Sequence, residues 1–180
     1  MIDNTVALPP DRVRTNVRYG VEINGDSSEV ETTLDACLQV QRWDRAFALL
    51  KQLVHIYRPG SPDLLPAYNR CLEAMVVDML INKSRTNVDR INQWVEVDMA
   101  DAGIKPDART YALKIKVALA TLVGSKRDRT VRRYWEKAKE QDAQFEVAGL
   151  RDVLTDSDVG KLNEICPINI DFEQIGRAHV

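Results

Sequence analysis

The sequence predicts an all-α fold in which antiparallel helical hairpins are stacked as a short solenoid. Apolar side chains recur at intervals of three and four residues between residues 28 and 140, which is the spacing of one face of an α-helix. Proline and glycine interrupt the pattern repeatedly, as they do where helices end. The hairpins begin near Ser28, Asp63 and Asp107, and their separations of roughly 35 and roughly 44 residues are typical of helical solenoids. A single hairpin would leave one apolar face in water, so neighbouring hairpins are expected to stack.

The first hairpin is expected to run from Ser28 to Tyr57. Its first helix is predicted to begin with a capping box, in which the side chains of Ser28 and Glu31 bond to free N–H groups of the first turn. Trp43 starts a second apolar stripe that continues to Tyr57. Residues 58–62 contain two prolines and a glycine. Proline ends the helix there because it lacks a backbone N–H and disfavours helix in the residue before it.

The second and third hairpins follow the same plan. The second begins at Asp63 and contains a polar loop at residues 82–86, which takes up the extra length of this repeat where an insertion disturbs packing least. It ends at Gly103, which we expect to adopt the left-handed backbone geometry of a helix cap. The third hairpin consists of a helix over residues 107–123 and another that runs to residue 140, with Gly124 between them.

Three segments outside the hairpins are predicted separately. Residues 1–27 show little periodicity and contain turn residues, so they are expected to form an extended N-terminal segment. Residues 141–174 are expected to form a tail that docks on the last hairpin, with a short helix capped by Thr155 and Asp158. Residues 175–180 resemble a translated sequencing adapter and are predicted to be non-native, so they are left out of the predicted fold.

The composition limits the class of protein. Apolar residues make up 44% of the 180-residue chain, which is enough for a packed core. The 25 basic residues nearly balance the 27 acidic residues. No overall field therefore attracts nucleic acid or an anionic membrane, and any contact with nucleic acid requires a local patch. No apolar run reaches the roughly 20 residues that a membrane span needs, so we expect a soluble protein.

The sequence predicts no catalytic residue and no metal site. His55 has no histidine, cysteine or paired carboxylate at metal-binding spacing. The acidic neighbours Asp98 and Asp101, and the acidic group at residues 152–158, are better explained as exposed helix faces and caps than as ligands of a catalytic Mg²⁺. The cysteines lie far apart without CxxC spacing and are predicted to be buried, reduced thiols. They are Cys37, Cys71 and Cys166.

The last predicted hairpin helix carries a local concentration of positive charge. Seven basic residues lie within fourteen positions, next to Tyr134 and Trp135. They are Lys126, Arg127, Arg129, Arg132, Arg133, Lys137 and Lys139. Arginine binds phosphate through paired hydrogen bonds and lysine adds charge, so this helix is a candidate contact with a nucleic-acid backbone. A solvated helix face is the simpler explanation, because Asp128, Glu136 and Glu140 dilute the patch.

The three tryptophans occupy equivalent places in the predicted repeats. Trp43, Trp94 and Trp135 each fall in the second helix of a hairpin. Large aromatic side chains dominate the packing of protein cores, although they also serve as platforms for stacked bases. We expect these three to pack in the core.

The junction between the second and third hairpins resembles the junction between pentatricopeptide repeats. In that family a Gly-x-x-Pro-Asp segment closes one hairpin and Thr-Tyr opens the next. The chain has Gly103, Pro106 and Asp107 at the first set of positions, and Thr110 and Tyr111 at the second. The resemblance implies that the stacked hairpins form a short pentatricopeptide-like solenoid.

The same resemblance assigns roles in RNA recognition. Pentatricopeptide repeats bind a base with one polar residue early in the first helix and another at the end of the repeat, which implies such roles for Asn69 and Asp107 in the middle unit. The extra loop at residues 82–86 alters the geometry that this code requires. In the third unit Ala112 takes the first position and cannot hydrogen-bond a base. The less specific expectation is therefore that RNA binds along a concave face of the solenoid without being read by a sequence code.

A longer resemblance covers residues 30–168. It is carried in order by segments 34–40, 42–46 and 152–156 and by Ile165-Cys166-Pro167. These segments resemble the N-terminal domain of fungal-type mitochondrial DNA-directed RNA polymerases, which are single-subunit, phage-type enzymes with a pentatricopeptide-bearing extension. The chain is accordingly expected to be a fragment of such an enzyme.

This resemblance implies an accessory role in transcription of the mitochondrial genome. The helical domain would contact RNA, DNA or a mitochondrial transcription factor. The polymerising carboxylates and their Mg²⁺ would belong to a catalytic domain joined in cis and absent from this chain. The location implied is the mitochondrial matrix, with the targeting segment upstream of Met1.

Two other functions are compatible with the sequence. A freestanding pentatricopeptide-type organellar RNA-binding protein would have further repeats on both sides of this segment. A protein-binding helical scaffold with no nucleic-acid role would agree with the nearly balanced charge.

Overall fold

The computed structural model describes residues 26–81, 87–141 and 151–167. Every secondary-structure element that it describes is a helix, so the predicted all-α class is confirmed. The chain divides into two compact units, residues 1–67 and residues 68–180. The predicted non-native segment and nearly all of the predicted extended N-terminal segment lie outside the described residues.

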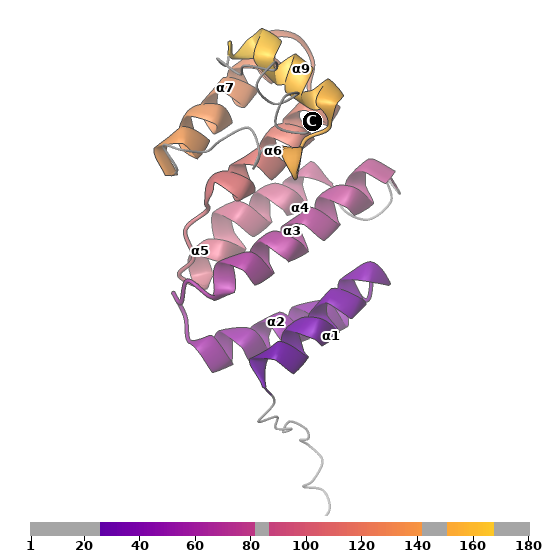
Figure 1. Ribbon diagram of the computed structural model, residues 1–180, viewed down its shortest axis with the longest axis vertical. Coiled ribbons are helices and arrows are strands. Elements are labelled where there is room, and N and C mark those ends of the chain that lie inside the picture. Colours follow the sequence, from indigo (N-terminus) through magenta and orange to yellow (C-terminus); the bar gives the residue numbers. More distant parts are fainter. Residues whose placement is uncertain (1–25, 82–86, 142–150, 168–180) are drawn as a thin grey trace, which may run out of the picture. The chain divides into compact units, whose positions relative to one another are not determined.

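The first unit contains a hairpin of two antiparallel helices, α1 (Ser27–Gln39) and α2 (Trp43–Tyr57), which lie side by side in Figure 1. The predicted apolar stripes form the core of this hairpin. The buried side chains include Val30, Leu34, Leu50 and Leu53. At the open end of the hairpin, the Tyr57 hydroxyl donates a hydrogen bond of 2.8 Å to the Glu31 carboxylate.

The start of α1 differs from the prediction. The cap is Asp26, whose carboxylate accepts a hydrogen bond of 3.2 Å from the Ser28 N–H. Ser28 lies inside the helix, and the Glu31 carboxylate accepts a hydrogen bond from the Tyr57 hydroxyl. The predicted capping box of Ser28 and Glu31 was therefore wrong. Aspartate caps helices as well as serine does, and here it stands two residues earlier in the chain.

The turn between α1 and α2 places Gln41 in the left-handed region, with φ of 58°. The Arg42 N–H bonds to the Cys37 carbonyl over 2.8 Å, and the Gln41 N–H bonds to the Leu38 carbonyl over 3.2 Å. This pair of bonds is the Schellman motif, which usually has glycine at the left-handed position. The turn keeps its geometry here without glycine, at a backbone cost of about 1–2 kcal/mol.

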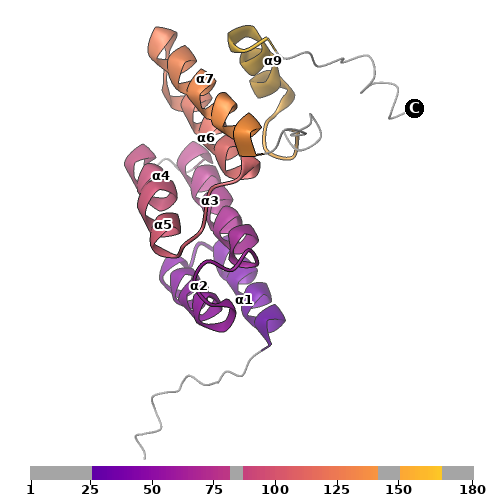
Figure 2. The ribbon, with the colours of Figure 1, turned by 90° about the vertical axis from the view of Figure 1, so that its left-hand side faces the viewer.

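The second hairpin pairs α3 (Leu64–Ile81) with a helical segment that the sequence predicts as one helix. That segment is made of α4 (Val88–Gln93), the π-helical turn η1 (Trp94–Asp98) and α5 (Met99–Asp101). Figure 2 shows α3 running beside α4 and α5. The predicted loop at residues 82–86 lies outside the described residues.

Aromatic contacts join the two sides of this hairpin. The rings of Tyr68 and Trp94 have centroids 5.2 Å apart, and the Trp94 indole N–H donates to the Tyr68 carbonyl over 3.3 Å. Burial raises the pKa of Tyr68 to about 12, so its hydroxyl stays neutral at physiological pH. The pair provides both apolar contact and a hydrogen bond that satisfies a buried indole.

The π-helical turn keeps Met99 in the core. Each residue of an α-helix turns by about 100°, so in a regular helix Met99 would point about 80° away from Ile91. The Met99 N–H bonds to the carbonyl of Trp94, five residues back, and this widened turn brings the two side chains into line. Met99 and Ile91 are both completely buried. Asp98 lies outside the core and pairs with Arg90 at 2.7 Å.

The hairpin ends at the left-handed glycine that the sequence predicts. Gly103 has φ of 73°. Its N–H bonds to the Ala100 carbonyl over 2.9 Å, and the Ile104 N–H bonds to the Met99 carbonyl over 2.8 Å. The motif is the same as at Gln41, with glycine in the position that favours it.

The third hairpin consists of α6 (Ala108–Thr121) and α7 (Gly124–Gln141), close to the predicted bounds. Asp107 caps α6 in a capping box with Thr110. The two helices lie antiparallel in Figure 2. Gly124, the predicted separator, has φ of 63°.

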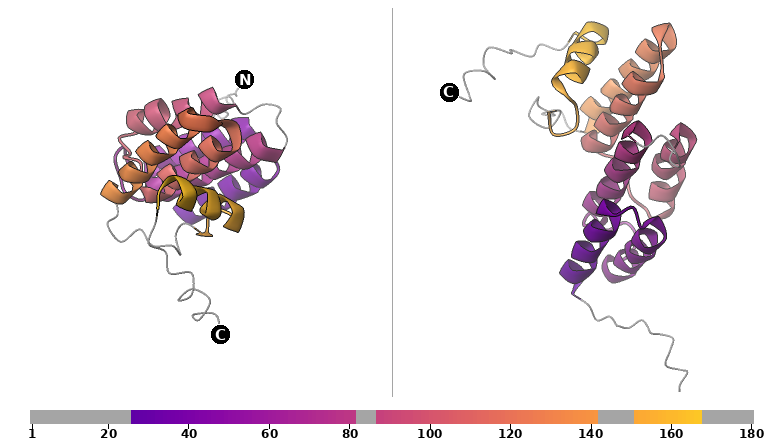
Figure 3. Two further views of the ribbon diagram at one scale, coloured as in Figure 1. Left: turned by 90° about the horizontal axis from the view of Figure 1, so that it is seen from above. Right: turned by 90° about the vertical axis from the view of Figure 1, so that its right-hand side faces the viewer.

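A short helix, α9 (Asp156–Ile165), lies beside α6 and α7 (Figure 3). It begins with the predicted capping box of Thr155 and Asp158. Two cations of the hairpin bond to carbonyl groups, one just before α9 and one at its last residue. The Lys116 ammonium donates to the Val153 carbonyl over 2.9 Å, and the Arg132 guanidinium donates to the Ile165 carbonyl over 3.3 Å. The described part of the tail is thus docked on the last hairpin.

Two glycines of the second unit should respond to alanine in opposite directions. Gly103→Ala is expected to destabilise the unit by about 1–2 kcal/mol, because a side chain at a positive φ is strained. Gly160→Ala is expected to stabilise it by up to about 1 kcal/mol, because Gly160 lies inside α9 with nothing within 4 Å of an added Cβ. Thermal or urea unfolding measures both. Equal shifts for the two variants would contradict the assigned cap.

Candidate nucleic-acid interface

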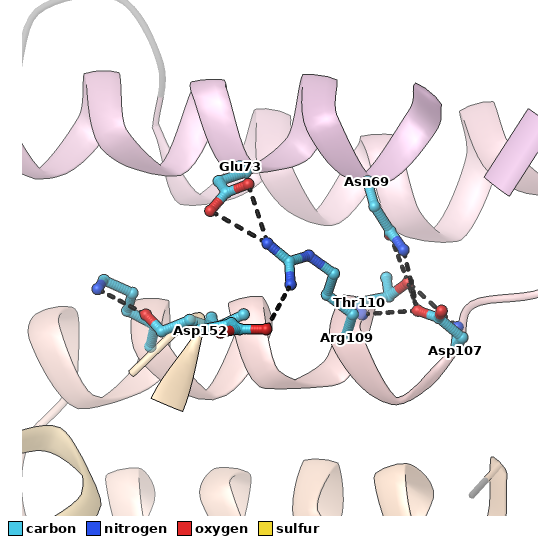
Figure 4. Close-up of polar contacts among 8 residues, drawn as sticks. Asn69, Glu73, Asp107, Arg109, Thr110 and Asp152 are labelled. Carbon is cyan, nitrogen blue, oxygen red and sulfur yellow. Dashed lines mark hydrogen bonds and ion pairs between the residues drawn. The ribbon is translucent and has the colours of Figure 1, made fainter. Parts of the chain in front are cut away.

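The two residues that the repeat pattern assigns to base recognition contact each other (Figure 4). Asn69 lies on α3 with 3% of its surface exposed, and Asp107 caps α6. The Asn69 amide N–H donates to the Asp107 carboxylate over 3.0 Å. The Thr110 hydroxyl donates to the Asn69 amide oxygen over 2.7 Å and accepts from the Asp107 N–H over 3.1 Å. We call these three residues the Asn–Asp–Thr network.

The hydrogen bonds within the network occupy donors and acceptors that Asn69 and Asp107 would need to bind a base. A base that bonded to Asn69 would have to replace two hydrogen bonds in a buried place, and an unpaired buried polar group costs about 1–3 kcal/mol. One partner is a carboxylate, and bonds to charged groups are the stronger ones. The role of Asn69 and Asp107 in base recognition stays a prediction. Their geometry favours a structural role in joining the second hairpin to the third.

Arg109 adds a second connection across the same helices. From α6 it reaches Glu73 on α3 at 3.3 Å and Asp152, just before α9, at 3.9 Å. Figure 4 shows its guanidinium between the two carboxylates. Its side chain is 38% exposed, so solvent screens these ion pairs and they contribute little to stability. They orient the side chains, and the two carboxylates compensate the positive charge of Arg109.

The basic residues of α7 differ in what they contact. Three of the seven have partners nearby. Arg127 pairs with Asp128 at 3.0 Å, and Lys139 pairs with Glu136 at 3.0 Å. Arg132 is exposed but bonds to the carbonyl at the end of α9, where a cation also favours the negative end of the helix dipole.

The other four have no carboxylate within ion-pair distance among the described residues. They are Lys126, Arg129, Arg133 and Lys137, and all are exposed. The structure therefore separates the predicted patch into a paired and an unpaired group. Contact of either group with nucleic acid stays a prediction.

Two of the unpaired cations lie against tyrosine rings. The rings of Tyr111 on α6 and Tyr134 on α7 are stacked with centroids 6.4 Å apart. Arg133 lies 5.1 Å from the centre of the Tyr134 ring, and Lys137 lies 5.9 Å from that of Tyr111. The ammonium of Lys114 lies 4.6 Å from the Tyr134 ring. We call these five residues the cation–tyrosine cluster.

Lys114 is the member of the cluster that the sequence analysis missed. Its side chain is 4% exposed, and its ion-pair partner, Glu96 of η1, lies 3.9 Å away and is 69% exposed. A lysine is rarely buried without a close partner. The signal in the sequence was a lysine between two apolar positions of α6, Leu113 and Ile115.

Of the two tyrosines in the cluster, Tyr134 is not an open stacking platform, and Tyr111 is partly exposed. Tyr134 is buried, with 9% of its surface exposed. Burial is the main cause that raises the pKa of Tyr111, with Glu140 adding to it, so the Tyr111 hydroxyl is neutral at physiological pH. Phosphate groups are therefore better suited than bases as ligands of these side chains.

The prediction that the tryptophans pack in the core is confirmed for two of the three. Trp94 and Trp135 are 3% and 7% exposed. Trp43 is partly exposed and lies 6.2 Å, centre to centre, from the ring of Phe47.

The cysteines are buried free thiols as predicted. Burial raises the pKa of Cys166, which keeps that thiol protonated. The described residues contain no group of three or more side chains that could hold a metal ion. None of the described helices has the length and apolar character that a membrane crossing requires.

Comparison with known proteins identifies the family. The protein-family model described as "RPO41-like, TPR repeats" matches residues 6–178. The chain belongs to this family. It is also similar to the mitochondrial DNA-directed RNA polymerase of Neurospora crassa, with 31% identity over 146 residues, which are 81% of this chain and 10% of the polymerase. The chain therefore spans about a tenth of the length of that relative. No solved structure matches it.

Family membership confirms the resemblance drawn from residues 30–168 to the N-terminal region of mitochondrial RNA polymerases. The RPO41-like family is described by TPR repeats, which are helix–turn–helix units of about 34 residues. The predicted class of helical repeat is confirmed with it.

Substitution of Asn69 tests whether the Asn–Asp–Thr network is structural. Asn69→Ala is expected to destabilise the second unit by about 1–3 kcal/mol, because it removes the two hydrogen bonds that join α3 to Asp107 and Thr110. Gln93→Ala, at an exposed position of α4, is the control and should change stability by less than about 0.5 kcal/mol. Urea unfolding measures both. If Asn69→Ala unfolds like the control, the network does not hold the hairpins together.

Proposed function

We propose that the chain is an accessory helical domain of a mitochondrial DNA-directed RNA polymerase and that the polymerising site lies in another part of that enzyme. The observation that carries this proposal is the family match over residues 6–178, together with the 31% identity to the Neurospora polymerase. The domain would act in transcription of the mitochondrial genome by contacting RNA or a transcription factor. Its location would be that of the polymerase, in mitochondria.

The surfaces of the second unit support a binding role. An array of helical hairpins offers an extended surface for partners. Exposed cations on α7, including Lys126, Arg129 and Arg133, lack carboxylate partners among the described residues. The full enzyme would bind Mg²⁺ in its catalytic domain, because phosphoryl transfer needs metal-bound carboxylates. No step of that chemistry is assigned to residues of this chain.

Continuing the reading frame tests the identity of the parent. Sequencing of genomic DNA or transcript across residues 171–180 and beyond is expected to reveal a phage-type polymerase domain downstream. The same read tests whether residues 175–180 are native. A downstream sequence of further helical repeats, without a polymerase domain, would support a freestanding RNA-binding repeat protein and end this proposal.

A polymerisation assay tests whether the catalytic site lies outside this chain. The purified chain with template, nucleotides and Mg²⁺ is expected to incorporate no nucleotide, whereas the full-length parent should do so under the same conditions. Incorporation is measured on a primed template with labelled nucleotide. Template-directed synthesis by the purified chain would overturn the assignment of catalysis to another domain.

A further inference from the structure

We propose that the cation–tyrosine cluster of α6 and α7 binds the sugar–phosphate backbone of single-stranded RNA without recognising the bases. The inference rests on the proposed function, which it deepens by naming the partner and the surface. The surface consists of the cluster and of Lys126, which precedes it on α7. All of these residues belong to the second unit.

The cluster holds its cations in fixed places. Arg133 and Lys114 lie 5.1 and 4.6 Å from the Tyr134 ring. The negative face of an aromatic ring attracts such cations, most strongly where they are shielded from water. The Arg133 guanidinium also donates to the Tyr134 hydroxyl, over 3.4 Å. A side chain that is already oriented loses less conformational entropy when it binds a ligand.

The positive charge at this surface is only partly neutralised. Arg133 and Lys137 have no carboxylate within ion-pair distance among the described residues, while the neighbouring Arg127 and Lys139 do. Behind them, Lys114 is paired only at 3.9 Å with an exposed glutamate. A buried charge keeps more of its field than an exposed one, because water and salt screen it less. An anion at this surface would therefore be attracted by both the exposed and the buried cations.

The spacing of the exposed cations fits a chain of charges. Lys126, Arg133 and Lys137 are seven and four residues apart, which places them on one side of α7. With a rise of 1.5 Å per residue they are spread over about 16 Å of the helix. This row can contact several phosphates of one strand. Single-stranded nucleic acids bind to such positively charged tracks with little sequence preference.

Base recognition is not part of the proposed site. Tyr134 is buried, and both Lys114 and Arg133 lie over its ring. The polar residues that the repeat pattern assigns to bases are bonded to each other. Backbone contacts alone carry no sequence information, so binding should be equal for different RNA sequences.

An acidic protein is the competing partner, and α7 is less suited to it. Protein interfaces combine charges with an apolar centre of aromatic and aliphatic side chains. None of the exposed large apolar side chains lies on α7, which the structure describes from end to end. The row of cations therefore favours a polyanion over a protein surface.

The test measures binding of the 180-residue chain to two short single-stranded RNAs of unrelated sequence at several salt concentrations. The charge-reversal variant R133E/K137E should bind both RNAs on the order of tenfold more weakly. It should reduce the slope of log K against log salt by about 1.4, which corresponds to two lost phosphate contacts. The variant R133Q/K137Q should weaken binding in the same direction by a smaller factor.

The matched control is K51E/K161E, which makes the same change in net charge at exposed lysines of α2 and α9. It should leave the salt slope unchanged, which separates a local site from a general effect of charge. Circular dichroism and thermal unfolding verify that each variant is folded. If R133E/K137E does not fold, the binding comparison is made with R133Q/K137Q.

The proposal is overturned if the chain binds neither RNA at low salt. It is also overturned if folded R133Q/K137Q binds like the unmodified chain, or if only one RNA loses affinity.

None of these binding results tests whether a polymerase domain lies downstream. Continuing the reading frame tests that separately, so failure of this inference and failure of the proposed function can be distinguished.

Discussion

The second unit depends on one buried polar contact, the bonds of Asn69 to Asp107 and Thr110. Asp107 serves two purposes, because the same carboxylate that caps α6 also accepts the Asn69 amide. The start of α6 is therefore fixed both to its own first turn and to α3. Apolar packing alone is non-directional, whereas this network admits one position of the third hairpin against the second. Arg109 and Lys114 then contact the partners that this position supplies.

The same network explains why a repeat pattern can be present without the recognition that it implies. In pentatricopeptide repeats the two polar positions are expected to face a base. Here the first position is occupied by a buried asparagine, and the second by the residue that binds it. Mutual hydrogen bonding satisfies both residues, so the pattern in the sequence persists for structural reasons. The RNA-binding role proposed above therefore uses another surface, the cations of α7 that have no carboxylate partner among the described residues.

Local features were predictable from the sequence, and contacts between distant residues were not. The helix bounds, the glycine cap at Gly103 and the capping box at Thr155 follow from signals within a few residues. The pairing of Asn69 with Asp107 joins positions 38 residues apart, and no local pattern indicates it. The basic residues of α7 were recognised, but their division into paired and unpaired groups depends on Asp128, Glu136 and the end of α9. The cap of α1 was missed because two suitable residues, Asp26 and Ser28, stand close together and only the turn geometry selects one.

The π-helical turn at Trp94–Asp98 has a consequence for the history of the second hairpin. A π-helical turn holds one more residue than the α-helical turn that it replaces. The second hairpin therefore has the form of a regular helix into which one residue was inserted, with the widened turn absorbing it. Because the extra residue is confined to five positions, the flanking segments keep their contacts on the same face. Homologous chains that lack one residue here can therefore retain the same hairpin, and an alignment that places the gap within residues 94–98 keeps Ile91 and Met99 equivalent in both.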